Sequence, residues 1–333
     1  LERSRRLGQH KMPRQGSLSW MAQGLWTGSE CSAIVLGHSA GVANRERKRH
    51  PGTMRDRNDN PAVAGTRPPL DTRRIATCTA AEIEARLAAP LPPGLHLVAT
   101  PIGNLGDITL RAITALATAG KLYCEDTRQS QKLLNRFGIS RRLDIYHEHN
   151  GERERPRILE ALARGQSVAM ISDAGTPLVS DPGYKLVRAA IEAGHAVYAI
   201  PGASAPMTAL VASGLPTDAF HFAGFLPSKT GARRERIAAL ARTRGTLVVF
   251  ESPSRLTDSL ADLAGIMGPR AAVVARELTK LNEHYHRGTL PELAAWAAGA
   301  AVKGEIVIVI GPRSDQPVSD EQILAALKPA LAA

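Results

Sequence analysis

The stretch Leu95-His-Leu-Val-Ala-Thr-Pro-Ile-Gly-Asn-Leu-Gly-Asp107 places a short apolar run directly before a loop rich in Gly, Pro and Asn. An apolar run of this length predicts a buried β-strand, and Asp107 is the expected N-cap of a helix that ends at Gly120. Further along the chain, short apolar runs alternate with amphipathic stretches, which is typical of an α/β fold. The first sheet is therefore expected to be rich in parallel strands.

The pattern of strands changes between Gly214 and Asp218, where turn residues interrupt the alternation. Strands are expected before this point at residues 95–99, 121–124, 143–146, 167–171 and 196–200, and after it at 220–225, 246–251, 271–276, 284–288 and 305–310. The third and fourth strands of the second set leave no room for a helix between them, which indicates antiparallel pairing. We therefore predict an N-terminal α/β domain over residues 94–214, a C-terminal α/β domain with a mixed sheet over 219–312, and a tail over 313–333 with an accessory helix at about 320–331.

The composition excludes several classes of protein. Of the 333 residues, 44% are hydrophobic and 22% are charged, which is ordinary for a globular protein and unlike a disordered or collagen-like chain. No uncharged apolar run reaches about 18 residues, so no membrane span is expected. Cys31, Cys78 and Cys124 are too few for a disulfide framework or a thiolate zinc site. These features predict a soluble protein of a reducing compartment, the cytoplasm.

Residues 1–93 are predicted to be a leader without a domain of their own. The formal net charge of the chain is +11, and residues 1–53 contribute +6 of it while lacking sustained helix or strand periodicity. Three interpretations of residues 1–53 stay open: a disordered basic arm, an Arg-rich transit peptide, or a non-native extension upstream of a start at Met54. Between Met54 and Pro93, a short helix is expected from Thr79, which would be its N-cap with Glu82 three residues later.

Loops rich in Gly, Pro, Ser and Thr follow three of the expected strands of the first domain, at residues 100–107, 172–183 and 201–204. In open α/β sheets, ligands bind at the carboxyl edge of the strands, so these loops predict a ligand site. Asp126 follows Gly103 at roughly the spacing of a dinucleotide-binding acid, but the glycines give only G-x-x-G, and no P-loop is present. Loops without a phosphate cradle suit a ligand with an adenosine and an amino-acid end.

Seven segments carry a resemblance to one family: residues 99–109, 125–128, 146–150, 172–183, 224–229, 250–253 and 275–280. Together and in this order they resemble the cytidine 2′-O-methyltransferases of 16S (small-subunit) ribosomal RNA, a branch of the tetrapyrrole (precorrin) methylase superfamily. The resemblance covers about residues 95–312. Thr176 stands where many members of the superfamily have an acid, and Ala203 where members of the branch often have a second proline.

The resemblance implies a two-domain tetrapyrrole-methylase-like fold that binds S-adenosylmethionine in the cleft between its domains, usually as a homodimer. It also implies a cytidine of 16S ribosomal RNA, in the small ribosomal subunit, as the substrate. The residues that would line the cofactor are Pro101, Ile102, Gly103, Gly175, Thr176, Pro177, Val179, Ser180, Ser204 and Ala205.

Methyl transfer to a ribose hydroxyl needs alignment of donor and acceptor and a group that removes the hydroxyl proton. The candidate bases are Glu125, Asp126, Glu148 and His149, at expected strand ends and loops on the ligand side. An equally good interpretation of residues 125–128 is a helix cap with an ion pair between Asp126 and Arg128, which would make Asp126 a poor base. The His-Glu-His sequence that ends at His149 lacks the further ligands that zinc requires, so no metal is expected.

A basic segment distinguishes an RNA substrate from a tetrapyrrole. Residues 226–244 carry six Lys or Arg against Glu235 alone, and concentrated positive charge beside a site is what RNA phosphates require. The residues predicted to bind RNA are Arg128, Lys229, Arg233, Arg234 and Arg236. A solvated helix face is the alternative interpretation of this segment. The alternative functions are a tetrapyrrole C-methyltransferase, a noncatalytic ribosome-assembly factor and a nicotinamide oxidoreductase.

Overall fold

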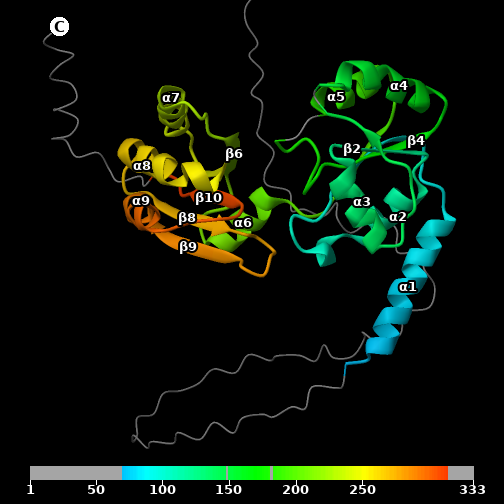
Figure 1. Ribbon diagram of the computed structural model, residues 1–333, viewed down its shortest axis with the longest axis horizontal. Coiled ribbons are helices and arrows are strands. Elements are labelled where there is room, and N and C mark those ends of the chain that lie inside the picture. Colours follow the sequence, from blue (N-terminus) through cyan, green and yellow to red (C-terminus); the bar gives the residue numbers. More distant parts are fainter. Residues whose placement is uncertain (1–69, 148, 181–182, 314–333) are drawn as a thin grey trace, which may run out of the picture. The chain divides into compact units, whose positions relative to one another are not determined.

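The computed structural model describes residues 70–147, 149–180 and 183–313, all of which belong to one compact unit. Two five-stranded sheets organise this unit (Figure 1). The strands of the first sheet all precede residue 214 and those of the second all follow residue 219, so the change of pattern in the sequence marks the change of sheet. Residues 1–69 of the predicted leader and the predicted tail helix lie outside the described residues.

The first sheet is parallel throughout. Its strands stand in the order β3-β2-β4-β1-β5, and every neighbouring pair is parallel. Their bounds are β1 (Gly94–Val98), β2 (Lys121–Cys124), β3 (Asp144–Ile145), β4 (Ser167–Met170) and β5 (Val197–Ile200). The predicted parallel-rich α/β architecture is confirmed, and β1 lies between the two strands whose loops were expected to share its ligand.

Helices cover both faces of this sheet because its strands are apolar on both sides. Leu122 and Cys124 of β2 pack in one buried cluster with the helices α2 and α3, whereas Tyr123 packs in the opposite cluster with α4 and α5. The helices are α2 (Leu110–Thr118), α3 (Thr127–Arg136), α4 (Gly151–Ala163) and α5 (Tyr184–Glu192).

The second sheet is mixed, as the strand spacing predicts. Its order is β6-β7-β10-β8-β9, in which β6 and β7 are parallel and the other neighbouring pairs are antiparallel. The strands are β6 (Phe220–Phe225), β7 (Thr246–Glu251), β8 (Ala271–Arg276), β9 (His284–Thr289) and β10 (Ile306–Ile310).

The central strand β10 shows how this sheet is packed. Ile306, Ile308 and Ile310 belong to the cluster under the helices α7 (Thr230–Leu240), α8 (Leu256–Met267) and α9 (Leu290–Gly299). Val307 and Val309 point to the other face, in a cluster with Leu210 of α6 (Ala205–Ser213). Since side chains alternate along a strand, the apolar side chains of β10 pack against helices on both faces of the sheet.

Two predicted helix starts are wrong. The first helix, α1 (Thr72–Ala88), begins well before Thr79 and is capped by Asp71, whose carboxylate accepts a hydrogen bond from the Arg74 amide. Residues 72–88 of the predicted leader are therefore helical. The N-cap of α2 is Thr109 rather than Asp107, because residues 105–107 form a separate 3-10 turn held by the Asn104 side chain.

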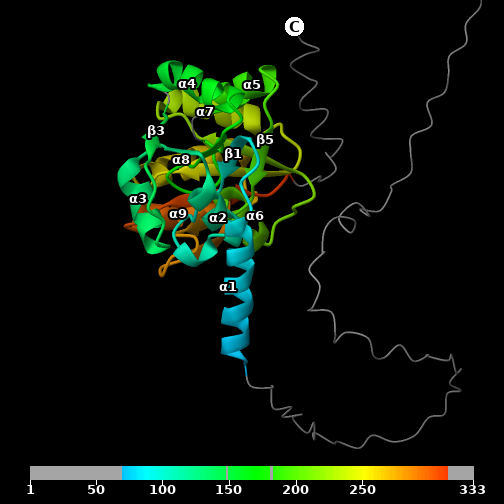
Figure 2. The same cartoon turned by 90° about the vertical axis from the view of Figure 1, so that its right-hand side faces the viewer.

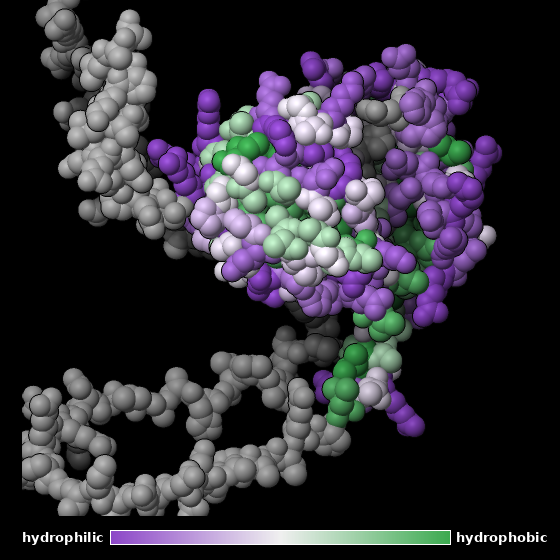
Figure 3. All heavy atoms as spheres, turned by 60° about the vertical axis from the view of Figure 1, so that its left-hand side comes forward, coloured by the Kyte–Doolittle hydropathy of each residue, from purple (hydrophilic) through white to green (hydrophobic). Residues whose placement is uncertain are grey.

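Helix α1 carries no buried residue, and Figure 2 shows it as a straight rod that extends from the rest of the described ribbon. Its surface includes the exposed apolar side chains Ile75 and Leu87, and apolar atoms are visible along it in Figure 3. Among the described helices, none is both long and apolar enough to cross a membrane.

Candidate ligand pocket at the edge of the first sheet

The three predicted ligand loops meet at the carboxyl edge of the first sheet. Thr100, after β1, exchanges backbone hydrogen bonds of 2.9 and 3.1 Å with Gly175, after β4. The Thr176 hydroxyl donates to the Ala203 carbonyl at 3.1 Å, which ties the loop after β4 to the loop after β5. The three loops therefore meet at one edge of the sheet, and their role as a ligand site stays a prediction.

A pocket of about 360 Å³ lies against these loops, in the size range of sites for small molecules and cofactors. The second sheet supplies its other wall, from the ends of β6, β7 and β8 and the start of β10. Its lining is Ile102, Ala174, Gly175, Thr176, Val179, Ser180, Ser204, Ala205, Pro206, Phe225, Phe250, Glu251, Ser252, Pro253, Leu278, Gly304, Glu305, Ile306 and Val307.

Seven of the ten residues predicted to line the cofactor line this pocket: Ile102, Gly175, Thr176, Val179, Ser180, Ser204 and Ala205. Pro101, Gly103 and Pro177 are not in its wall. Gly103 instead lies beneath the Lys280 side chain, since a β-carbon at Gly103 would come within 2.5 Å of Lys280 Cγ. The lack of a side chain at Gly103 therefore allows the close contact with Lys280 and does not shape the wall of the pocket.

The pocket residues from the second sheet were not predicted individually. Three of the segments that carry the resemblance, residues 224–229, 250–253 and 275–280, supply Phe225, the Phe250–Pro253 stretch and Leu278. Residues 304–307 lie in none of the segments that carry the resemblance. They line the pocket because β10 is central in its sheet and begins at the pocket.

The charged groups of the wall are acidic. Glu251 is buried, and its carboxylate accepts hydrogen bonds from the Ser259 hydroxyl at 2.6 Å and the Ser252 amide at 2.7 Å, with Arg255 Nη2 also 2.6 Å away. Glu305 is exposed and pairs with Lys280 at 3.1 Å. No Lys or Arg belongs to the part of the wall that the structure describes, so this part of the wall offers no cation to a phosphate group.

Asp126 lies where the helix-cap interpretation of the sequence puts it. It is the N-cap of α3, accepting from the Arg128 amide at 2.8 Å, and its carboxylate pairs with Arg128 Nη2 at 3.0 Å. Hydrogen bonds from the Arg128 side chain and backbone hold the pKa of Asp126 below its usual range. A carboxylate held ionised in this way is a weak proton acceptor. Glu125 directly precedes it, and Glu148 lies outside the described residues.

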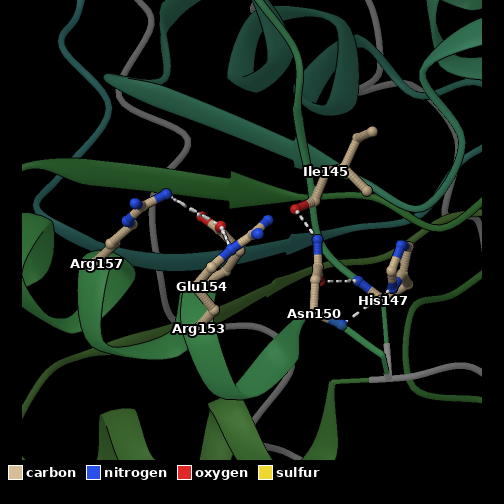
Figure 4. Close-up of polar contacts among 6 residues, drawn as sticks. All are labelled: Ile145, His147, Asn150, Arg153, Glu154 and Arg157. Carbon is tan, nitrogen blue, oxygen red and sulfur yellow. Dashed lines mark hydrogen bonds and ion pairs between the residues drawn. The ribbon is translucent and has the colours of Figure 1, made fainter.

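The loop after β3 is organised by Asn150 (Figure 4). The Asn150 side chain accepts from the His147 amide at 2.9 Å and donates to the Ile145 carbonyl at 2.9 Å, while the Asn150 amide donates to His147 Nδ1 at 3.2 Å. Nearby, Glu154 holds Arg153 and Arg157. No group of His, Cys, Asp or Glu side chains within the described residues could hold a metal ion.

Comparison with known proteins places this sequence in a family. Residues 94–294 match the model of the tetrapyrrole (corrin/porphyrin) methylases. The chain belongs to this family. It is 55% identical to ribosomal RNA small subunit methyltransferase I of Mesorhizobium japonicum, over 74% of this chain and 84% of that protein. A second relative with the same name, from Halalkalibacterium halodurans, is 48% identical over 71% of this chain and 81% of its own.

The solved structures agree on the fold of this tetrapyrrole methylase. A conserved hypothetical protein from Aeropyrum pernix K1 has a TM-score of 0.51 and 21% identity, over 71% of this chain and 90% of its own. Diphthine synthase also has a TM-score of 0.51, with 17% identity over 65% of this chain and 89% of its own. The predicted tetrapyrrole-methylase-like fold is confirmed.

The basic segment of this family member divides into structural and exposed cations. Arg233 is 4% exposed, and its Nε donates to Asp262 at 2.8 Å, while Arg234 Nε donates to the other carboxylate oxygen at 2.7 Å. The structure therefore does not support the prediction that Arg233 binds RNA, since its guanidinium is buried and paired with Asp262 of α8. Lys229 and Arg236 are exposed, as are Arg128 and most of the Arg234 side chain.

We expect Asp262→Ala to lower the free energy of unfolding by about 3–5 kcal/mol, because it leaves the buried Arg233 charge without its partner. Burial opposes ionisation of Asp262, but hydrogen bonds from Arg234 and Arg233 outweigh it and keep its pKa low. The stabilisation is therefore present above the ordinary aspartate pKa and is lost as the pH falls through the lower value of the folded protein.

Chemical denaturation at neutral and acidic pH measures this effect. The matched control is Glu160→Ala, which breaks an ion pair with Arg164 that is exposed on both sides and should cost less than about 1 kcal/mol. Equal losses in the two variants would contradict a structural role for the Arg233–Asp262 pair.

Proposed function

We propose that this protein is an S-adenosylmethionine-dependent methyltransferase that methylates the ribose 2′-oxygen of a cytidine in 16S ribosomal RNA of the small subunit. The observation that carries the proposal is the 55% identity, over 84% of its length, to a protein named ribosomal RNA small subunit methyltransferase I. The cytidine and the 2′-oxygen rest on the resemblance of the sequence motifs. We further propose that it acts in the cytoplasm as a homodimer.

S-adenosylmethionine fits the chemistry of the pocket. The molecule carries a positive sulfonium, an ammonium and a carboxylate, and no Lys or Arg of the described wall would oppose its sulfonium. The two carboxylates of that wall are already paired, Glu251 with Arg255 and Glu305 with Lys280. Apolar side chains such as Ile102, Val179 and Leu278 suit an adenine and a ribose face. Gly175 has a left-handed φ of +78°, and a β-carbon there would lie 3.2 Å from Ile102 Cγ2. The loop after β4 therefore packs closely against the loop after β1.

When bound, S-adenosylmethionine supplies the methyl group, and the residues of the chain have two tasks. The first is alignment, because an in-line displacement depends on the approach of the hydroxyl oxygen. The Thr176 contact with Ala203 fixes the two loops that would hold the donor. The second task is to accept the hydroxyl proton. Since Arg128 holds the pKa of Asp126 low, Glu125, Glu148 and His149 are the better candidates for this base.

Transfer of labelled methyl to small ribosomal subunits from a strain that lacks this gene tests the function. We expect label on one nucleotide, at a ribose 2′-oxygen of a cytidine, when the modified RNA is mapped. Label on a base would contradict the proposed position, and label on a corrin precursor but not on subunits would favour a tetrapyrrole C-methyltransferase. Binding of S-adenosylmethionine without transfer to naked RNA or subunits would favour a noncatalytic assembly factor.

Filling the pocket should abolish binding of the methyl donor. Ala205 lines the pocket at the first turn of α6, so Ala205→Trp places an indole in the volume that the donor would occupy. We expect affinity for S-adenosylmethionine, measured by calorimetry, to fall at least about a hundredfold, since the ring and the ligand exclude each other. Ala261→Trp, on the exposed face of α8, is the matched control. Unchanged affinity in the Ala205 variant would place the donor elsewhere.

The exposed cations of the basic segment should contribute to RNA binding through phosphates. Lys229→Glu combined with Arg236→Glu should weaken binding to small subunits and reduce the slope of log affinity against log salt by roughly two, one for each phosphate that is no longer neutralised. Affinity for S-adenosylmethionine should stay the same, because neither residue lines the pocket. Exposed Glu152→Lys on α4 is a charge-changing control. An unchanged salt slope would assign these cations to a solvated helix face.

A further inference from the structure

The loop between β8 and β9, residues 277–283, presents a leucine to solvent. Leu281 is 100% exposed and is followed by exposed Asn282 and Glu283. Isolated exposed leucines are common on protein surfaces and need no explanation by themselves. The way this loop is held distinguishes Leu281 from the others.

Hydrogen bonds within the loop brace its tip. The Glu283 carboxylate accepts from the Thr279 amide at 2.9 Å and from the Tyr285 hydroxyl at 2.7 Å. The backbone adds two turns, from the Lys280 amide to the Glu277 carbonyl at 3.0 Å and from the Glu283 amide to the Lys280 carbonyl at 3.1 Å. Leu281 therefore stands at the tip of a cross-braced turn.

The base of the loop is fixed to the pocket. Lys280 Nζ pairs with Glu277 at 2.9 Å and with Glu305 at 3.1 Å, and the Asn104 amide donates to the Thr279 hydroxyl at 3.1 Å. Leu278 and Glu305 are themselves part of the pocket wall. The exposed leucine is thus three residues from the wall of the site proposed to hold the methyl donor.

The backbone of the loop is strained. Glu277 and Thr279 have φ values of +53° and +64°, in the left-handed region that side chains other than glycine disfavour. Among the described residues, the other non-glycine positions of this kind are Leu178 and Ser180, in the loop on the opposite wall of the pocket. Strain of this sort persists only where the surrounding contacts enforce it, and it clusters at functional sites.

We propose that Leu281 is an apolar wedge that contacts the bases beside the target nucleotide and holds that nucleotide out of its stack. The inference rests on the proposed function, in which the substrate is RNA. A ribose must leave the regular path of the strand to bring its 2′-oxygen to a recessed methyl donor, and proteins use leucine side chains to part stacked bases. A rigid loop beside the pocket keeps the wedge at one distance from the reacting centre.

A second copy of the chain fits this tip less well. Stable interfaces between copies bury about 800 Å² on each partner, with an apolar core at the centre of that area. Leu281 has Lys280, Asn282 and Glu283 as its neighbours in the chain, and Lys280 is occupied by two carboxylates. One leucine among polar groups suits insertion between bases.

The first test replaces the leucine in the full chain. Leu281→Ser should raise KM for small subunits by about tenfold or more, the loss expected when a leucine no longer becomes buried. Affinity for S-adenosylmethionine and the melting temperature should not change, because the side chain contacts solvent alone in the free protein. Leu281→Met keeps an apolar side chain and should leave KM for small subunits close to the wild-type value. Ile191→Ser, an exposed apolar position on α5, is the matched control, and equal KM values for the Leu281 and Ile191 variants would overturn the inference.

The second test needs binding but no turnover, so it separates this inference from the proposed function. A photo-crosslinking benzoylphenylalanine is placed at Leu281, at Ile191 as the negative control, and at exposed Ser228, beside Lys229, as the positive control. Crosslinks from position 281 to 16S ribosomal RNA support the wedge. Crosslinks from 281 to a second copy of the chain, or RNA crosslinks from 228 alone, overturn it. If the wild-type protein transfers no methyl but position 281 crosslinks to RNA, the proposed function fails and the contact with RNA stands.

Discussion

The packing of helix α6 on the second sheet is the contact on which the pocket depends. The helix follows β5 of the first sheet, yet Ala209 and Leu210 are buried against Val248, Val273 and Val309 of the second. Arg287 of β9 adds a polar tie, since its Nη2 donates to the Ala212 carbonyl at 2.6 Å, near the end of the helix where carbonyl groups lack helical partners. Because a helix is stiff, fixing its body also fixes Ser204, Ala205 and Pro206 at its start, and these line the pocket. Ile102 and Leu278 belong both to this cluster and to the wall, so the pocket is continuous with the core that joins the two sheets.

Much of the fold could be predicted because the strands are short apolar runs with clear turn residues on either side. The bounds expected for β6, β7 and β8 agree with those observed, and the change of pattern near Gly214 marks the passage to the second sheet. Helix starts were harder to predict. Asp107 and Thr79 have good capping chemistry, but a residue caps a helix only where the backbone turns. The side chains of Asn104 and Asp71, which accept hydrogen bonds from backbone amides, set the turns elsewhere.

The site was predictable on the side of the first sheet, because parallel strands bring their loops to one edge. The wall from the second sheet depends on packing between distant segments, which periodicity does not report. Arg233 shows that predictions from charge along the sequence have the same limit. Its partner, Asp262, lies 29 residues away on the next helix, so counting charges along the sequence cannot separate a buried ion pair from a surface that binds phosphates.

Charged residues are distributed differently in the wall of the pocket and on the surface around α7. The described wall of the pocket holds no Lys or Arg, and its two carboxylates are paired with cations outside it, Glu251 with Arg255 and Glu305 with Lys280. The exposed cations Lys229 and Arg236 lie outside that wall, beside and on α7, and they are the residues that we propose to contact RNA phosphates. The loop with Leu281 belongs to neither set: Lys280 is paired with Glu277 and Glu305, Glu283 accepts hydrogen bonds from Thr279 and Tyr285, and the tip offers apolar surface.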